Sequence, residues 1–211
     1  PTAQAPARPR LVVVVVVDQM RADFLTRFPQ MFQGGLARFI GEGAMYTEAH
    51  HNHSGTETSP GHATISTGSF PSRHGITANE WFERAEGKTV YSVDDPATRL
   101  VGGREGAGRS PKRLMTDALG DWLKRASGDS KVFSVSVKDR AAVLMGGKRP
   151  DGVYWYDDAG SFVTSTYYAT AVPAWVDSFN LSRPAEKYLA AGWSRLLPAE
   201  AYAAFIAERA A

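Results

Sequence analysis

The chain has 211 residues and a mass of 22.9 kDa, enough for one domain with a sizeable hydrophobic core. Its net charge of +2 and the lack of a basic patch with interleaved aromatic residues argue against nucleic-acid binding. The absence of cysteine excludes disulfides and thiolate metal sites. Residues 1–10, PTAQAPARPR, predict a disordered lead-in, and they would also suit a chain from which a signal peptide has been removed.

The next stretch, Leu11–Asp18 (LVVVVVVD), has no alternation of apolar and polar residues. Such a run predicts a strand buried on both faces, at the centre of a parallel sheet, and it is too short to span a membrane. The run ends in a carboxylate, and ligands gather at the carboxyl ends of strands in open α/β sheets. Asp18 is therefore either the N-cap of a helix over Gln19–Phe28 or a functional carboxylate.

A second helix is predicted over Phe32–Ile40 and a short second strand over Ala44–Ala49. Thr58 then precedes Pro60, and proline is favoured in the first turn of a helix. Thr58 is thus predicted to cap a helix that continues through Ala63–Thr67.

Further along, Trp81–Arg84 and Thr89–Val93 predict a strand pair. The glycine-rich stretch Val101–Arg109 lacks the pattern of a phosphate-binding loop, so a mobile loop is predicted there. Ser110 is expected to cap a helix whose apolar face includes Leu114–Leu123.

The remaining strands are predicted over Val132–Val137 and in a hairpin of Val153–Tyr156 with Phe162–Ser165. If the first of these strands continues, Lys138 and Arg140 lie on one face of it. Helices are predicted over Ala174–Phe179, Ala185–Ala191 and Pro198–Ala210.

Several polar residues of these elements could carry chemistry, and each also has a structural explanation. Thr58 could be a nucleophile at a helix N-terminus, where the dipole and free N–H groups favour negative charge, or only a cap. Lys138 and Arg140 could hold a phosphoryl dianion, or they could be a solvated charged turn.

The histidines are equally open to two interpretations. His50, His51 and His53 could bind a metal ion, although histidines in a polar loop are more often solvated. His62 could orient Thr58 or simply pack within the helix. His74 is expected to anchor its loop through hydrogen bonds.

Taken together, three blocks resemble the alkaline phosphatase superfamily, on the threonine-nucleophile branch that also holds the nucleotide pyrophosphatases/phosphodiesterases. The blocks are Val12–Arg21 (VVVVVVDQMR), Thr58–Ile76 (TSPGHATISTGSFPSRHGI) and Val135–Arg140 (VSVKDR). Diesterases of the branch have Thr-Phe-Pro-Asn-His, whereas Ser59 and Gly61 replace the Phe and Asn here.

The resemblance implies a site with two zinc ions in the complete enzyme. Asp18 would ligate one zinc, and Thr58 would bind the same ion and attack phosphorus, giving a phosphothreonine intermediate. Asn79 would contact a non-bridging phosphoryl oxygen. Lys138 and Arg140 would bind the phosphoryl group, and because diesterases lack this pair, it favours phosphate monoesters as substrates.

The resemblance also shows what this chain does not contain. The family takes its remaining zinc ligands from segments beyond the Lys/Arg pair, and no histidine follows Arg140. We therefore expect those ligands to lie outside this chain, on a C-terminal part of the same polypeptide that would be its partner. A sulfatase is disfavoured, because the chain lacks cysteine and has His62 where the sulfatase motif has arginine.

The expected architecture is α/β, with a mostly parallel central sheet flanked by helices in residues 11–144 and the start of a cap insertion in residues 145–211. The expected function is that of a zinc-dependent alkaline phosphatase that hydrolyses phosphate monoesters to inorganic phosphate, with no nucleic-acid or membrane partner. A phosphodiesterase/nucleotide pyrophosphatase, or an inactive fragment that binds anions or a partner chain, remains an alternative. Family habit predicts a periplasmic or secreted protein.

Overall fold

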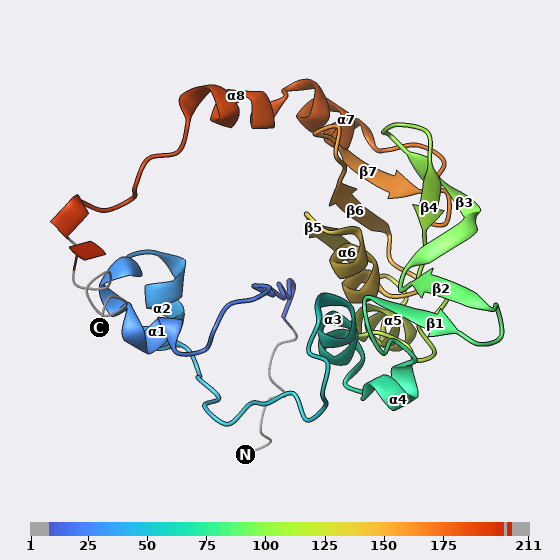
Figure 1. The fold of residues 1–211 in the computed structure, drawn as a ribbon, viewed down its shortest axis with the longest axis horizontal. Helices are drawn as coiled ribbons and strands as arrows, with labels where there is room; N and C mark the ends of the chain where they lie inside the picture. The colour runs from blue at the N-terminus through green and yellow to red at the C-terminus, as the bar shows by residue number, and fades with distance from the viewer. Residues whose placement is uncertain (1–8, 201, 204–211) are drawn as a thin grey trace, which may run out of the picture.

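The computed structural model describes residues 9–200 and 202–203. Residues 1–8 of the predicted lead-in fall outside this range. So do residues 201 and 204–210 of the helix predicted over Pro198–Ala210. Within it, strands and helices combine in an α/β arrangement, which confirms the predicted fold class (Figure 1).

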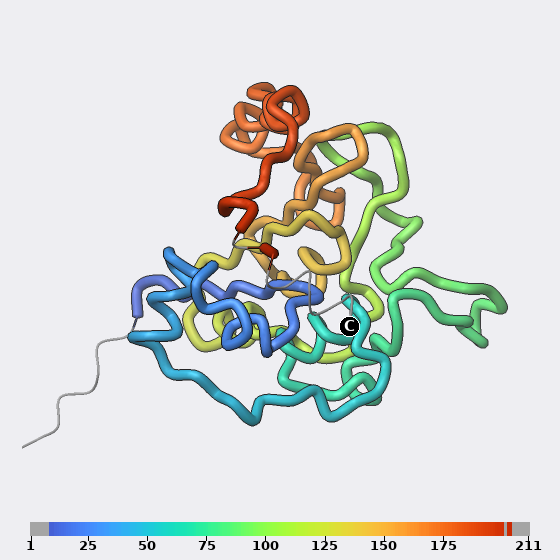
Figure 2. The backbone as a smooth tube through the Cα atoms, turned by 60° about the vertical axis from the view of Figure 1, so that its left-hand side comes forward, coloured from blue at the N-terminus to red at the C-terminus, as the bar shows by residue number. Residues whose placement is uncertain are grey.

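In residues 9–200 and 202–203, seven strands form two sheets. The strands are β1 (Glu80–Glu83), β2 (Lys88–Tyr91), β3 (Asp94–Val101), β4 (Ala107–Arg109), β5 (Phe133–Ser136), β6 (Gly152–Tyr156) and β7 (Phe162–Ser165). β1 and β2 pair as a separate antiparallel hairpin that projects from the body of the molecule (Figure 2). The other five strands form one sheet in the order β4-β3-β7-β6-β5.

The sheet is mixed, whereas a mostly parallel sheet was expected. β5 and β6 pair in parallel, because α6 connects them as a crossover, and the other neighbours pair antiparallel. Two of the three antiparallel pairs, β3–β4 and β6–β7, are joined by short reversals, of which the second is the Asp157–Gly160 turn, and the third pair, β3–β7, joins strands far apart in the sequence.

Most of the helices are short. They are α1 (Phe24–Arg27), the 3₁₀ helix η1 (Pro29–Met31), α2 (Gly35–Glu42), α3 (Thr58–Thr67), α4 (Pro71–His74), α5 (Leu119–Ala126), α6 (Asp139–Gly146), α7 (Ala174–Leu181) and α8 (Pro184–Ala191). α6 packs on β5 and β6, and α3 packs on α6. α1 and α2 lie apart from the sheet and are joined to it by extended segments (Figure 1).

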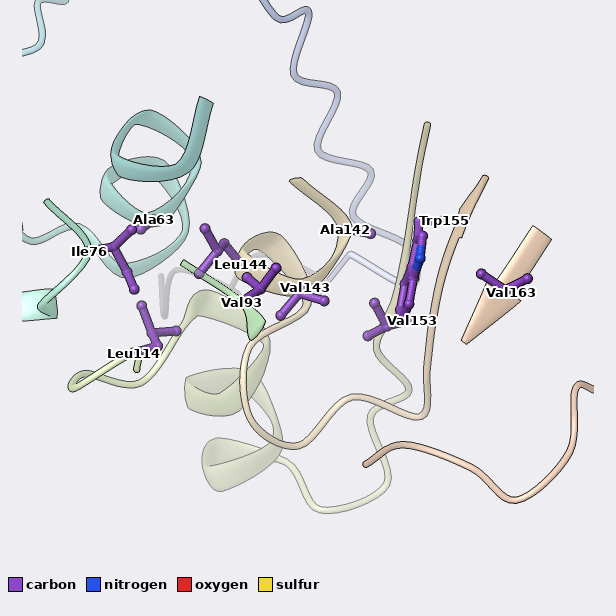
Figure 3. Packing of buried hydrophobic residues seen from close by; sticks show 10 residues of the cluster. All are labelled: Ala63, Ile76, Val93, Leu114, Ala142, Val143, Leu144, Val153, Trp155 and Val163. Atoms are coloured by element: carbon purple, nitrogen blue, oxygen red, sulfur yellow. The ribbon is translucent and has the colours of Figure 1, made fainter. Parts of the chain in front are cut away.

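The hydrophobic core fills the space between these helices and the sheet. It extends from Ile76 near α3, across Leu144 and Val143 of α6, to Trp155 and Val163 on the sheet (Figure 3). The hydroxyl of Ser66 in α3 donates a hydrogen bond to the carbonyl of Leu144 at 2.7 Å, which joins the two helices. The core therefore fixes α3 relative to α6, and these are two of the elements that carry the candidate site.

The prediction that Leu11–Asp18 forms the central strand is wrong. The segment has no strand pairing, and four of its valines are more than half exposed. It runs along a cavity of about 330 Å³ that Val12, Val14 and Val16 line together with β5, α3 and α5. A strand needs a hydrogen-bonded neighbour, and no described strand pairs with this segment.

Other predictions for the first part of the chain also need correction. The helix expected to begin at Gln19 begins at Phe24, because Gln19 has a φ of +62°, which a right-handed helix does not allow. Ala44–Ala49 is not a strand and has no pairing partner. The N-cap of α3 is Glu57 in an extended conformation, so Thr58 is the first helical residue and not the cap.

Two elements in the middle of the chain also differ. The stretch Val101–Arg109 contains the end of β3 and all of β4, because Gly102, at a φ of +88°, allows the chain to reverse between them. The helix expected after Ser110 begins only at Leu119, where the side chain of Asp121 accepts the backbone N–H of Ala118.

The remaining local predictions are confirmed: the β1–β2 pair, strand β5, the β6–β7 hairpin, and helices α7 and α8. The boundary at residue 145 stays a prediction; β6 and β7 both lie beyond it and belong to the main sheet. No helix in residues 9–200 or 202–203 is both long and apolar enough to cross a membrane.

Candidate active site

Three predicted site residues meet at the carboxyl end of β5. The hydroxyl of Thr58 donates a hydrogen bond to Asp18 Oδ2 at 3.2 Å, and Lys138 Nζ donates to the same carboxylate oxygen at 2.6 Å. Lys138 Nζ also lies 3.4 Å from Thr58 Oγ1. The valine segment runs beside α3 and α6 (Figure 1), and the Asp18 carboxylate at its end reaches these two residues.

Thr58 owes its position to the start of α3. It is only 7% exposed, and as the first helical residue it lies where the helix dipole and unpaired N–H groups favour an anion. Four residues later, the Nδ1–H of His62 donates to the carbonyl oxygen of Thr58 at 2.7 Å. Of the two roles considered for His62, this contact supports positioning of the Thr58 backbone.

Asn79 lies next to the same helix start. Its side-chain oxygen accepts the backbone N–H of Ser59 at 2.9 Å, and its own backbone N–H donates to Glu57 Oε2 at 2.6 Å. The hydroxyl groups of Ser59 and Ser92 are 2.7 Å apart and complete the connection to the residue after β2. Because the oxygen of the Asn79 amide is used, its NH₂ group remains as the donor end.

The Lys/Arg pair does not lie on a strand extension, as the spacing suggested. Lys138 is the N-cap of α6 and Arg140 is already helical, so the two residues do not share one face of a strand. Arg140 Nη1 donates to the hydroxyl of Tyr91 at 2.9 Å. Burial alone would lower the pKa of Arg140, but Tyr91 and the negative charges of Asp139 and Asp18 raise it above its usual value. Arg140 is thus coupled to the Asp18 group through charge.

The charges at the centre of the site keep Asp18 ionised. The hydrogen bond from Lys138 lowers the pKa of Asp18 below its usual value; burial opposes this shift, and the charge of Lys138 and the Thr58 hydroxyl reinforce it. A carboxylate with a lowered pKa is a poor proton acceptor and a good ligand for a cation.

The other histidines lie away from this group. The rings of His51 and His53 contact each other edge to face, and His50 lies 3.4 Å from Glu48. His53 Nε2 and His74 Nε2 both hydrogen-bond to Thr64 Oγ1, at 3.2 and 3.1 Å. His74 also accepts the backbone N–H of Ile76 through Nδ1, as expected for a residue that anchors a loop.

A zinc ion would find two suitable donors among the predicted ligands. Asp18 Oδ2 and Thr58 Oγ1 converge, and the ammonium group of Lys138 already marks the space between them as favourable for positive charge. Zinc sites in proteins use three or four ligands, so these oxygens fit as part of a larger set. In the part of the chain that the structure describes, no group of three or more His, Asp or Glu residues is placed to hold a metal ion.

Comparison with known proteins identifies the family. The sequence profile for Type I phosphodiesterase / nucleotide pyrophosphatase matches residues 12–205. The chain belongs to this family. It is 44% identical over 203 residues to alkaline phosphatase PhoV of Synechococcus elongatus, an alignment that covers 94% of this chain and 37% of PhoV.

Two solved structures of a family relative resemble the fold. The crystal structure of wild-type alkaline phosphatase PafA has a TM-score of 0.91 and 40% identity, covering 95% of this chain and 39% of that one. A PafA mutant with a threonine, an asparagine, a lysine and an arginine replaced has a TM-score of 0.84 and 38% identity, covering 87% of this chain and 36% of its own. The chain thus spans well under half the length of these family members.

The structure adds residues that the sequence did not single out. Glu57 holds the backbone of Asn79, and Tyr91 and Asp139 hold Arg140. Arg109 joins this second group through Asp139 at 2.6 Å. Only Asp139 had a signal in the sequence, its place between Lys138 and Arg140. The others come from elements whose packing is not readable from spacing.

Proposed function

We propose that this chain supplies part of the active site of a zinc-dependent phosphate monoester hydrolase that works through a phosphothreonine intermediate on Thr58. The observation that carries the proposal is the convergence of the Thr58 hydroxyl with Asp18 and Lys138, from segments 40 and 80 residues away. The names of the relatives support the reaction class, since PhoV and PafA are alkaline phosphatases.

Residue spacing gives independent support. The replaced threonine and asparagine of the PafA mutant are 21 positions apart, and its replaced lysine and arginine are two apart. Thr58 and Asn79 are likewise 21 positions apart, and Lys138 and Arg140 two apart. The four residue types therefore recur here in the same order and with the same local spacing.

Each side chain has a role that follows from its position. Thr58 Oγ1 would attack phosphorus, forming the Thr58 oxygen–phosphorus bond as the bond to the leaving alcohol breaks. The NH₂ group of Asn79, together with Lys138 and Arg140, would bind the non-bridging oxygens, over which the transition state spreads its charge. Water would then cleave the phosphothreonine, releasing inorganic phosphate.

Asp18 and Thr58 would contribute ligands to the zinc. When bound, zinc supplies Lewis-acid chemistry, lowering the pKa of hydroxyl and water oxygens and neutralising charge on the phosphoryl group. Because its pKa is lowered, Asp18 stays a carboxylate and is a poor acceptor for the proton of Thr58.

The test is replacement of Thr58 by alanine in the zinc-loaded full-length polypeptide. We expect Thr58→Ala to abolish the phosphoprotein trapped by acid quench during turnover of a phosphate monoester, with an unchanged unfolding midpoint. Thr56→Ala, two residues upstream in the exposed loop, is the matched control and should keep the covalent phosphate. Covalent phosphate retained in the Thr58 variant would remove Thr58 from this role.

The family name also covers phosphodiesterases and nucleotide pyrophosphatases, which keeps a diesterase as the second candidate. Turnover of p-nitrophenyl phosphate and of bis-p-nitrophenyl phosphate distinguishes the two. Because Lys138 and Arg140 suit a phosphoryl group with free oxygens, we expect the monoester to be preferred. A strong preference for the diester would refute the role given to this pair.

A further inference from the structure

Tyr91, at the end of β2, connects Arg140 to the fold. Its hydroxyl accepts a hydrogen bond from Arg140 Nη1 at 2.9 Å and donates one to Asp139 Oδ1 at 2.6 Å. The guanidinium carbon also lies 5.8 Å from the centre of the Tyr91 ring, within range of a cation–π contact. The proposed phosphoryl-binding arginine is therefore held by a side chain from the β1–β2 hairpin, 49 residues away.

The acceptor of the tyrosine proton is itself fixed. Asp139 Oδ1 also accepts the backbone N–H of Arg140 at 2.7 Å, and Asp139 Oδ2 accepts Arg109 Nε at 2.6 Å. Arg109 in turn bonds to Asp94 at 3.1 Å. Because both carboxylate oxygens are engaged, Asp139 can hold the Tyr91 hydroxyl in one orientation.

Within residues 9–200 and 202–203, the side chain of Arg140 donates its hydrogen bond to the hydroxyl of Tyr91. The Nε of Arg140 is buried there without a hydrogen-bond acceptor. Burial, and then the nearby Asp139, raises the pKa of Tyr91 to about 12, so the hydroxyl keeps its proton at any working pH of an alkaline phosphatase. Removing this hydroxyl would leave the guanidinium without its hydrogen-bonded anchor.

We infer that Tyr91 is a positioning residue that fixes the Arg140 guanidinium for a phosphate monoester and thereby contributes to selection against diesters. The inference rests on the proposed function. A monoester offers free oxygens to a planar guanidinium, and two parallel hydrogen bonds need the fork held in one orientation. A diester carries a second ester group in place of one of these oxygens and gains less from that orientation.

The test compares Tyr91→Phe with the wild type in the zinc-loaded full-length polypeptide. We expect kcat/KM for p-nitrophenyl phosphate to fall about tenfold, as for loss of one hydrogen bond to a charged group. The inhibition constant of inorganic phosphate should rise by a similar factor, and kcat/KM for bis-p-nitrophenyl phosphate should stay within about twofold. Equal losses on both substrates, or none on either, would overturn the inference.

Two further variants separate positioning from general damage. Tyr154→Phe removes a hydroxyl from a core tyrosine of β6 and should leave all three constants unchanged. The Tyr91→Phe/Arg140→Ala double variant should be no worse than Arg140→Ala, because the hydroxyl acts through the guanidinium. Additive losses in the double variant would mean that Tyr91 acts by another route.

The outcomes also separate this inference from the proposed function. If the wild type neither hydrolyses the monoester nor binds inorganic phosphate, both fall. If the wild type does both and Tyr91→Phe matches it, only the positioning role of Tyr91 is wrong.

Discussion

At the scale of single residues, hydrogen bonds define the candidate site more sharply than spacing does. Asp18 was open to two interpretations, and its contacts with Thr58 and Lys138 favour the functional one, because a helix does not begin behind it. The four residues whose types and spacing recur in the PafA mutant could all be named from the sequence: Thr58, Asn79, Lys138 and Arg140. Tyr91 and Glu57 could not, because each acts through a neighbour and carries no chemistry of its own.

His74 gives a prediction about pH at the same scale. Burial, and then the charge of His53, lowers its pKa from 6.5 to about 4. The unfolded chain therefore takes up this proton first as the pH falls. The free energy of unfolding should decrease between pH 6.5 and about pH 4, by at most about 3 kcal/mol, and the contribution should level off below that range.

The measurement is chemical denaturation of wild type and His74→Asn across this pH range. The asparagine oxygen can still accept the backbone N–H of Ile76, which the ring accepts at 3.1 Å. The difference in stability between the two proteins should shrink as the pH falls, which removes the contribution of the acidic residues common to both. A difference that does not vary with pH would contradict the prediction.

At the scale of elements, local signals predicted what local interactions decide. The β6–β7 hairpin was foreseen because its turn residues fix it, whereas helix α6, which makes the crossover between the parallel strands β5 and β6, was not predicted. The start of one helix, α5, was misplaced because a contact distant in the sequence sets it. α5 begins late because Asp121 binds both its first turn and the chain after α6.

Asp121 therefore carries a prediction about stability. Its carboxylate is fully buried and accepts the backbone N–H groups of Ala118 at 2.9 Å, Lys148 at 3.0 Å and Arg149 at 2.8 Å. Asp121→Asn would turn an NH₂ group toward one of these donors. We expect the free energy of unfolding to fall by about 2–3 kcal/mol, measured by urea denaturation. Asp129→Asn, in the exposed turn after α5, should be neutral, and equal effects of the two would contradict the role of Asp121.

At the scale of the whole molecule, the valine segment shows what the sequence could not decide. Its composition is that of a buried strand, but burial also needs a neighbour to pair with and a layer to cover it. In the described structure Val135 of β5 and most of these valines remain exposed. Among the described residues no strand pairs with this segment, so its composition alone could not fix its place in the fold.

The small number of ligand atoms in the site predicts how this chain behaves alone with zinc. Asp18 and Thr58 provide two ligand atoms, and a tight zinc site needs three or four. We expect the isolated 211-residue chain, dialysed against zinc, to retain less than stoichiometric metal by elemental analysis and to show no turnover of p-nitrophenyl phosphate. Stoichiometric zinc together with turnover would show that the chain holds a complete site.

The distance along the chain between the contacting groups sets the order in which the molecule can assemble. Asp18 and Lys138 are 120 residues apart, whereas Glu83 and Lys88 of the first hairpin are neighbours across a turn. The entropy lost in closing a loop grows with its length, so contacts of large separation form after local ones during folding. Hairpins are thus expected early, the α3–α6 packing, whose Ser66–Leu144 contact spans 78 residues, later, and the carboxylate of Asp18 last.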